Sequence, residues 1–192
     1  MLFNSYEFIL FFLPLTLIIY FLLTRAKQTI AAKSWLVLSS LFFYGWWNPK
    51  YLPLLIGSIL FNYCSGAAIY KATGASRKRT LIFAIAANIA LLGYFKYTNF
   101  FIENISRLTG AEVGIASIVL PLAISFFTFT QIAFLVDTYN KEAKDYSLVN
   151  YSLFVTFFPH LLAGPIIHHK EMMPQFDSTG NKLLNYDNLT AG

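Results

Sequence analysis

Long apolar blocks separated by short polar stretches dominate the sequence of this 192-residue chain. A helix that crosses a membrane needs roughly 20 mostly apolar residues, within a working range of about 17 to 25. Five blocks approach this measure, and we predict that each is a spanning helix: Tyr6 to Leu23, Ser34 to Trp47, Leu52 to Tyr70, Leu81 to Tyr97 and Ile115 to Val136. The pattern therefore predicts an all-α, polytopic membrane helical bundle.

A sixth apolar block, YSLFVTFFPHLLAGPIIHHK, covers Tyr151 to Lys170 and carries signals that break a helix. Pro159 removes a backbone donor, Gly164 loosens the helix, and Pro165 pushes Gly164 towards extended geometry. We therefore predict a broken or re-entrant sixth segment within one membrane domain, residues 1–192. Broken backbone at membrane depth survives only where protein buries it or where it lines a water-filled cavity. A kinked helix that packs without any ligand fits the residues equally well.

Composition agrees with a membrane protein and argues against a nucleic-acid partner. The chain is 57% hydrophobic and 12% charged, whereas soluble domains carry about 25% charged residues. The net charge is +5, but the 14 lysines and arginines are scattered through short loops instead of forming one basic face. The single cysteine, Cys64, excludes a disulfide within the chain.

The distribution of basic residues predicts the orientation, because cytoplasmic loops carry the excess of lysine and arginine. The loops after the first, third and fifth predicted spans hold nine such residues, and the loops on the opposite side hold three. The richer set is Arg25, Lys27, Lys33, Lys71, Arg77, Lys78, Arg79, Lys141 and Lys144; the poorer set is Lys50, Lys96 and Arg107. We expect the N-terminus to lie outside a cytoplasmic membrane.

Three polar side chains inside apolar segments are candidates for a functional interior. His160 lies within the predicted break, and Gln131 and Asp137 lie in the fifth predicted span. An ionisable residue at membrane depth indicates a functional site, because its burial in hydrocarbon costs free energy. The competing interpretations are a neutral His160 bonded to a carbonyl that the proline frees, and an Asp137 that meets water at the inner boundary.

His168, His169 and Lys170 form a basic cluster after the break. If this cluster lies on the cytoplasmic side it could contact phosphate groups; the alternative is a solvated cluster at the interface. No metal site is predicted, because two adjacent histidines lack a third ligand nearby. Gly-rich phosphate loops, Ser-His-Asp sets and Cys-x-x-Cys pairs are absent from the sequence.

Four stretches, taken in order, resemble the membrane-bound O-acyltransferase family and its bacterial branch of alginate O-acetyltransferases. They are MLFNSYEFILFFLPL, FFYGWWNPKYLPLL, LPLAISFFTFTQIAFLVDTYN and FFPHLLAGPIIHHKEMMPQF. The resemblance implies many helices around a tunnel, through which an acyl group from a cytoplasmic donor such as acetyl-CoA reaches an acceptor. It also implies that Pro159, Gly164 and Pro165 help to build this core, and that His168, His169 and Lys170 are candidates for contact with the donor.

The same resemblance implies a longer parent protein, whose catalytic histidine is expected beyond Gly192. None of His160, His168 and His169 matches that histidine, so this chain alone is expected to be inactive. The expected partners are the lipid bilayer, the acyl donor, and an extracytoplasmic acetylation protein or polysaccharide acceptor, with no bound cofactor. The expected function is O-acylation of an exported polysaccharide; the alternatives are a transporter or export channel, or a non-catalytic fragment.

Overall fold

The computed structural model describes residues 3–109, 118–142, 147–163 and 169–177. Within these ranges the chain is helical and contains no β-strand, which confirms the all-α prediction. The elements in chain order are a π-helical turn η1 (Phe8–Phe12), α1 (Leu13–Arg25), α2 (Thr29–Trp47), a 3-10 turn η2 (Pro49–Tyr51), α3 (Leu52–Lys71), α4 (Gly74–Thr109), α5 (Ile124–Tyr139), α6 (Leu148–Thr156), α7 (Phe158–Ala163) and α8 (His169–Asp177).

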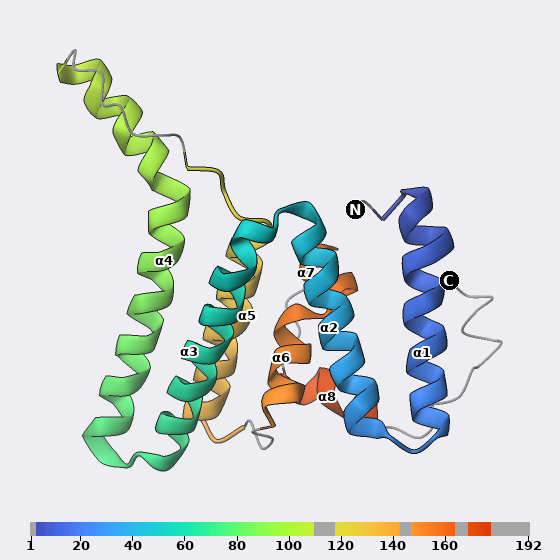
Figure 1. The fold of residues 1–192 in the computed structure, drawn as a ribbon. Coiled ribbons are helices and arrows are strands. Elements are labelled where there is room, and N and C mark those ends of the chain that lie inside the picture. The colour runs from blue at the N-terminus through green and yellow to red at the C-terminus, as the bar shows by residue number, and fades with distance from the viewer. Residues whose placement is uncertain (1–2, 110–117, 143–146, 164–168, 178–192) are drawn as a thin grey trace.

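The helices form two groups that meet in the middle of the bundle (Figure 1). In one group α3, α4 and α5 pack on one another, and in the other α2 lies between α1 and α6. Contacts of α6 with α3 and α5 join the groups, and the short α7 packs against α2 and α5. The broken segment formed by α6 and α7 therefore lies in the interior of the fold.

Three helical stretches are long and apolar enough to cross a membrane: Phe8–Arg25, Pro49–Lys71 and Gly74–Thr109. They correspond to the first, third and fourth predicted spans. The 19 residues of α2 include Lys33 and several serines, and α5 has only 16 residues. The count of five spans plus a broken sixth stays a prediction.

The fifth predicted span begins later than its apolar pattern indicates. We expected a helix from Ile115, but α5 starts at Ile124, and Ile118–Leu120 is non-helical. Asn99 explains the difference, because its side chain accepts from the N–H of Ile118 at 2.9 Å and donates to the Ile118 carbonyl at 2.7 Å. These two bonds satisfy the N–H and the carbonyl of Ile118, which in a helix would be paired with other backbone groups.

Helix α4 is much longer than the predicted fourth span, Leu81 to Tyr97. Its 36 residues correspond to about 54 Å at 1.5 Å per residue, against a hydrocarbon thickness of about 30 Å. Figure 1 shows its final turns extending past the ends of the neighbouring helices. The C-terminal part of α4 therefore continues beyond the bundle instead of forming a separate loop.

The distribution of side chains is the reverse of that in a soluble domain. Large apolar side chains are exposed along every long helix, such as Phe11 on η1, Leu38 on α2 and Phe83 on α4. Buried positions include many polar side chains, among them Asn62 and Gln131, which are fully enclosed. In a helical bundle surrounded by lipid, apolar side chains face the hydrocarbon, and polar side chains face the interior of the bundle.

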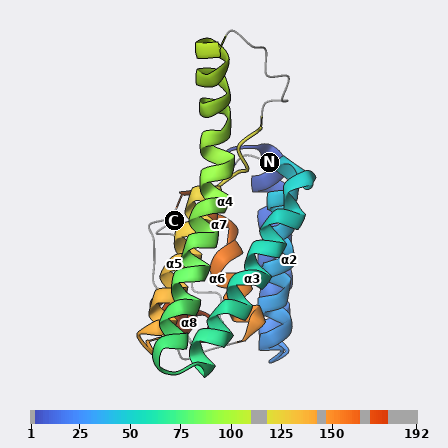
Figure 2. The same cartoon turned by 90° about the vertical axis from the view of Figure 1, so that its left-hand side faces the viewer.

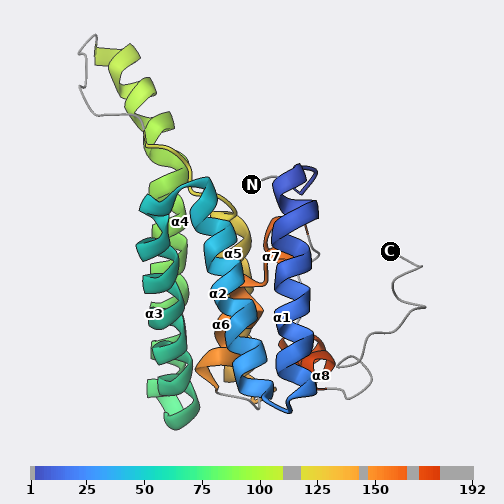
Figure 3. The same ribbon diagram turned by 45° about the vertical axis from the view of Figure 1, so that its right-hand side comes forward.

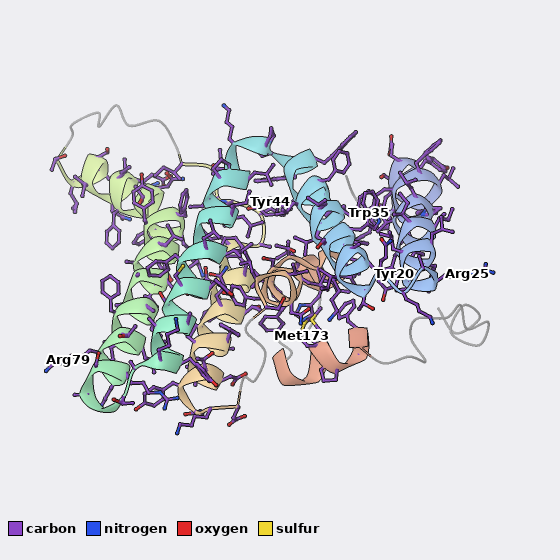
Figure 4. All side chains as sticks on the ribbon, turned by 60° about the horizontal axis from the view of Figure 1, so that its bottom comes forward. Tyr20, Arg25, Trp35, Tyr44, Arg79 and Met173 are labelled. Atoms are coloured by element: carbon purple, nitrogen blue, oxygen red, sulfur yellow. The ribbon has the colours of Figure 1, made fainter. Side chains whose placement is uncertain are left out.

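The loops that carry the basic excess lie at one end of the bundle. The α1–α2 and α3–α4 connections and the C-terminal end of α5 all lie at this end in Figures 1 and 3. Figure 4 views the bundle from this end, with Arg25 and Arg79 pointing away from the helices and Tyr44 pointing inward. The fold thus collects the basic loops on one side, as the orientation argument requires.

Candidate functional site

The sixth segment is broken at Phe157, where the backbone leaves helical geometry with φ −49° and ψ 108°. The Phe157 carbonyl accepts from the N–H groups of His160 at 3.0 Å and Leu161 at 2.9 Å, which starts α7. Pro159 is the second residue of α7, a position where its missing N–H leaves no helical bond unmade. The helix is thus interrupted two residues before the proline, and a broken or re-entrant sixth membrane segment stays a prediction.

Ser40 of α2 satisfies the backbone group that the break frees. Its Oγ accepts from the N–H of Phe158 at 3.2 Å, while its hydroxyl donates to the Leu36 carbonyl at 2.7 Å. The ring of Phe158 lies among Phe8, Phe12 and Phe43, with ring centroids 5.2–5.9 Å apart. Protein, and not lipid, therefore surrounds the break, at the meeting point of η1, α2 and α7.

The other residues of the broken segment have different positions. His160 is buried, and its ring lies edge-on to Phe126 of α5 at 4.9 Å between centroids. Pro159 is exposed. Gly164, Pro165 and His168 lie outside the described residues. His169 and Lys170 begin α8.

Gln131 belongs to a buried hydrogen-bond network that joins three helices. Its Oε1 accepts from the Ser58 hydroxyl at 2.7 Å and from Asn62 Nδ2 at 2.5 Å, both on α3. Asn62 and Asn88 of α4 donate to each other at 3.0 and 2.6 Å. Sequence reasoning identified Gln131 but missed the other three residues, although two asparagines inside apolar blocks were a usable signal.

The interior also holds polar atoms that have no hydrogen-bond partner among the described residues. They include the hydroxyls of Tyr44 on α2, Thr128 and Thr130 on α5 and Tyr151 on α6, and Nε2 of Gln131 on α5. Buried polar groups in proteins are paired in the great majority of cases. These atoms leave hydrogen-bonding capacity along α5 for water, a substrate or further protein.

The end of the bundle with the basic loops also encloses charged side chains. Asp137 is only 6% exposed. Arg77 of α4 donates to the carbonyls of Thr138 at 3.0 Å and Tyr139 at 2.5 Å, and its guanidinium lies over the Tyr139 ring. Lys33 is buried and donates to Asn150 Oδ1 at 2.9 Å.

The candidate residues are distributed along α5 and do not meet at one point. Phe126, which contacts His160, and Asp137 are 11 residues apart, or about 16 Å along a helix, with Gln131 between them. Among the described residues, no three His, Cys, Asp or Glu side chains are grouped so that they could hold a metal ion. This arrangement fits the wall of a route through the bundle better than a single catalytic centre.

Comparison with known proteins gives a match over nearly the whole chain. The model of the MBOAT, membrane-bound O-acyltransferase family matches residues 9–192. A peptidoglycan O-acetyltransferase of Helicobacter pylori is 45% identical over 219 aligned positions, which cover 100% of this chain and 42% of that protein. A probable alginate O-acetylase of Pseudomonas aeruginosa is 33% identical over 92% of this chain and 35% of its own length.

A more distant relative is a teichoic acid D-alanyltransferase of Lacticaseibacillus rhamnosus, 25% identical over 64% of this chain and 29% of its own. No solved structure matches the chain. The chain spans less than half the length of the curated relatives it matches. The extent of the family match and the identity to these relatives lead to one conclusion: the chain belongs to the membrane-bound O-acyltransferase family.

Proposed function

We propose that the chain is the N-terminal part of a membrane O-acyltransferase that transfers acetyl or a similar small acyl group to an exported polysaccharide. The donor is a cytoplasmic acyl thioester such as acetyl-CoA, and the acceptor is a polysaccharide hydroxyl on the other side of the membrane. The bilayer and an extracytoplasmic acetylation protein or the polysaccharide itself are the partners. The relatives support this proposal because their names describe O-acetylation of peptidoglycan and alginate.

The observation that carries the proposal is the break at Phe157 beside a polar interior. A helix interrupted at membrane depth is tolerated where it lines a cavity or is covered by protein. Here the break lies against α2, and His160 of α7 packs on α5. The hydroxyl and amide groups along α5 give a polar route its hydrogen-bonding groups.

Within this route we assign the lining to Gln131, Asp137, Pro159 and His160, together with Gly164 and Pro165. The role of these residues is to hold and orient the acyl group and the acceptor. We place the catalytic histidine in the remainder of the parent protein. Residues 1–192 are in this proposal one wall of a single, longer membrane domain.

His168, His169 and Lys170 are proposed to contact the phosphates of the donor. Two observations support this placement: α8 begins at His169, and Figure 3 shows α8 at the end of the bundle that carries the basic loops. The net positive charge of that end favours a polyanionic donor. We also propose that the N-terminus lies outside a bacterial cytoplasmic membrane and that Arg77 and Arg79, at the start of α4, lie inside, because cytoplasmic segments carry the excess of lysine and arginine.

The test is to express the complete reading frame that contains these residues in a bacterial strain that lacks its own polysaccharide O-acetyltransferase. We expect the polymer to regain O-acetyl groups, as measured by NMR of the purified polysaccharide, while residues 1–192 alone restore none. His160→Gln and Asp137→Asn in the complete protein should lower acetyl content. Arg79→Gln, a variant at an exposed position in the first turns of α4, is the control. Unchanged acetyl content with the complete protein contradicts the proposal.

A kinetic measurement separates the donor site from the lining. Lys170→Gln should raise the KM for acetyl-CoA and leave kcat unchanged, because it removes a contact made equally in the ground and transition states. Lys141→Gln removes the same charge from the α5–α6 loop and is the matched control. An equal loss of kcat in both variants argues against a phosphate contact at Lys170.

A further inference from the structure

A groove separates α3 from α4 at one edge of the bundle. It has a volume of about 340 Å³, and its walls are formed by these two helices alone, with Gly57 and Phe61 on α3 and Ala87 and Leu91 on α4. Gly57 and Phe61 are exposed, so the groove is open at the side of the bundle. Figure 2 faces this edge, with α3 and α4 side by side.

The groove exists because one position on α3 carries no side chain. A Cβ atom built on Gly57 would meet nothing within 4 Å. In a membrane such a space is next to lipid tails, and an unfilled gap loses the dispersion contacts of every atom that lines it. The space is large enough for several consecutive methylene groups of a chain that lies along the helices.

The chemistry of the groove selects an apolar occupant. Ser58 and Asn88 lie at its base, but the Ser58 hydroxyl donates to Gln131, and Asn88 Nδ2 donates to Asn62 and to the Ala84 carbonyl. These donors are already engaged within the protein. The side walls are apolar, so a hydrocarbon chain fits where a polar ligand does not.

Two basic side chains lie beyond one end of the groove. Lys50 precedes the start of α3 and Lys96 follows the lining residues of α4, and because the two helices are antiparallel both lie at the same end (Figure 1). Both are exposed, and the sequence has no Asp or Glu between Glu7 and Glu103. Lysines at the boundary of the bilayer extend their charges to the headgroup level, where they attract phosphate.

We propose that this groove binds one acyl chain of an anionic phospholipid, whose phosphate lies at Lys50 and Lys96. The lipid comes from the leaflet at the Lys50 end of the bundle. The site is distinct from the route along α5, because the residues that line it belong to α3 and α4. The proposal requires a membrane protein but does not depend on acyl transfer.

The experiment reconstitutes the chain in nanodiscs made of equal parts phosphatidylglycerol and phosphatidylcholine. One lipid at a time carries a photoreactive diazirine in its acyl chain, and cross-linked peptides are identified by mass spectrometry. We expect phosphatidylglycerol to cross-link mainly to residues 53–61 and 87–91. Gly57→Phe should lower this yield several-fold. Gly93→Phe is the matched control, because a Cβ atom at Gly93 also meets nothing within 4 Å, but Gly93 lies outside the groove lining. This variant should leave the cross-linking yield unchanged.

The headgroup preference is tested with Lys50→Gln and Lys96→Gln. Each should lower the ratio of phosphatidylglycerol to phosphatidylcholine cross-links by roughly fivefold, the effect expected for one basic side chain at an anionic membrane surface. Far-UV circular dichroism and gel filtration establish that each variant is folded. Three results overturn the proposal: even cross-linking over all exposed helices, an unchanged yield in folded Gly57→Phe, or occupation of the groove by a second copy of the chain.

Discussion

The side-chain amides of Asn62 and Asn88 donate to each other, with N–O distances of 3.0 and 2.6 Å, and so join α3 to α4. Two backbone carbonyls fix the orientation of the pair, because Asn62 Nδ2 also donates to Ser58 and Asn88 Nδ2 to Ala84. Polar side chains that bond across helices hold membrane bundles together where no hydrophobic force acts between the helices.

Replacing one member of this pair should destabilise the bundle. Asn88→Leu removes the donor to the buried Asn62 Oδ1 and one acceptor of Asn62 Nδ2, and we expect a loss of about 1–2 kcal/mol in the free energy of unfolding. Titration with SDS, followed by circular dichroism, measures the change.

The double variant Asn62→Leu/Asn88→Leu removes both amides together and should lose less than the sum of the two single variants. Additive losses would show that the two side chains act independently, contrary to the reciprocal geometry.

Ser40 should stabilise the interrupted segment at Phe157–Phe158, whereas its neighbour Ser39 should not. Ser40→Ala leaves the buried N–H of Phe158 unpaired, which costs about 1–3 kcal/mol. Hydrogen exchange at the Phe158 amide should accelerate in the same variant.

Ser39→Ala is the matched control, because Ser39 is also buried on α2 but its hydroxyl has no hydrogen-bond partner among the described residues. This change should alter stability by less than about 0.5 kcal/mol. Equal losses in the two variants would mean that the Ser40 bond does not support α7.

Gly66 should be the least replaceable glycine of α3. A Cβ atom there would lie 2.8 Å from Cε1 of Phe134 on α5, so Gly66→Ala forces the two helices apart at a cost of about 1–3 kcal/mol. At Gly93 a Cβ meets nothing within 4 Å, and Gly93→Ala should be neutral or stabilise by up to about 1 kcal/mol. Thermal denaturation in detergent compares the two, and a neutral Gly66→Ala would contradict the close packing.

Arg77 should stabilise the end of α5. Arg77→Gln removes charge-assisted bonds to the Thr138 and Tyr139 carbonyls at a half-buried site, which predicts a loss of about 1 kcal/mol. Arg79→Gln removes the same charge from an exposed position of the same helix and should have little effect on stability. If both variants lose stability equally, the loss comes from the change in net charge and not from the bonds of Arg77 to the carbonyls at the end of α5.

Cysteine labelling tests the orientation directly. In a Cys64→Ser background, which removes the single native cysteine, Lys50→Cys and Arg79→Cys lie at opposite ends of the bundle. A maleimide that cannot cross the membrane should label Lys50→Cys in intact cells and reach Arg79→Cys only after lysis. The opposite pattern would place the N-terminus inside.

The pattern of apolar residues was sufficient to predict an all-helical fold, because an apolar block long enough to cross a membrane is read from local sequence. Pro159, with the glycine and proline that follow, signals an interruption wherever the segment lies. The start of α5 could not be predicted in this way. The apolar residues 118–120 resemble helix, but their backbone is held by side chains from other parts of the chain: Asn99 bonds Ile118, and the Tyr51 hydroxyl donates to the Val119 carbonyl.

The candidate site was predicted less completely, because its contacts also join residues that are distant in sequence. Gln131 and His160 are conspicuous as polar residues in apolar surroundings, but their partners are set by the packing of helices. The contact of the His160 ring with Phe126 could not be predicted, because it depends on how α7 packs on α5; the carbonyl partner suggested by the sequence stays a prediction. The role of Asn62 depends on its approach to Asn88 and Gln131, which no local pattern encodes.

The three-helix network also implies an order of events during synthesis. Asn62 and Asn88 lie on consecutive helices, whereas Gln131 leaves the ribosome 43 residues after Asn88. At 5–20 residues per second this interval is about 2–9 s. The α3–α4 hairpin therefore has time to close its amide pair before α5 enters the membrane. The Ser58 hydroxyl and the Asn62 amide N–H on α3 are then in place as donors for Gln131 Oε1, and they favour the register of α5 that brings Gln131 to Ser58.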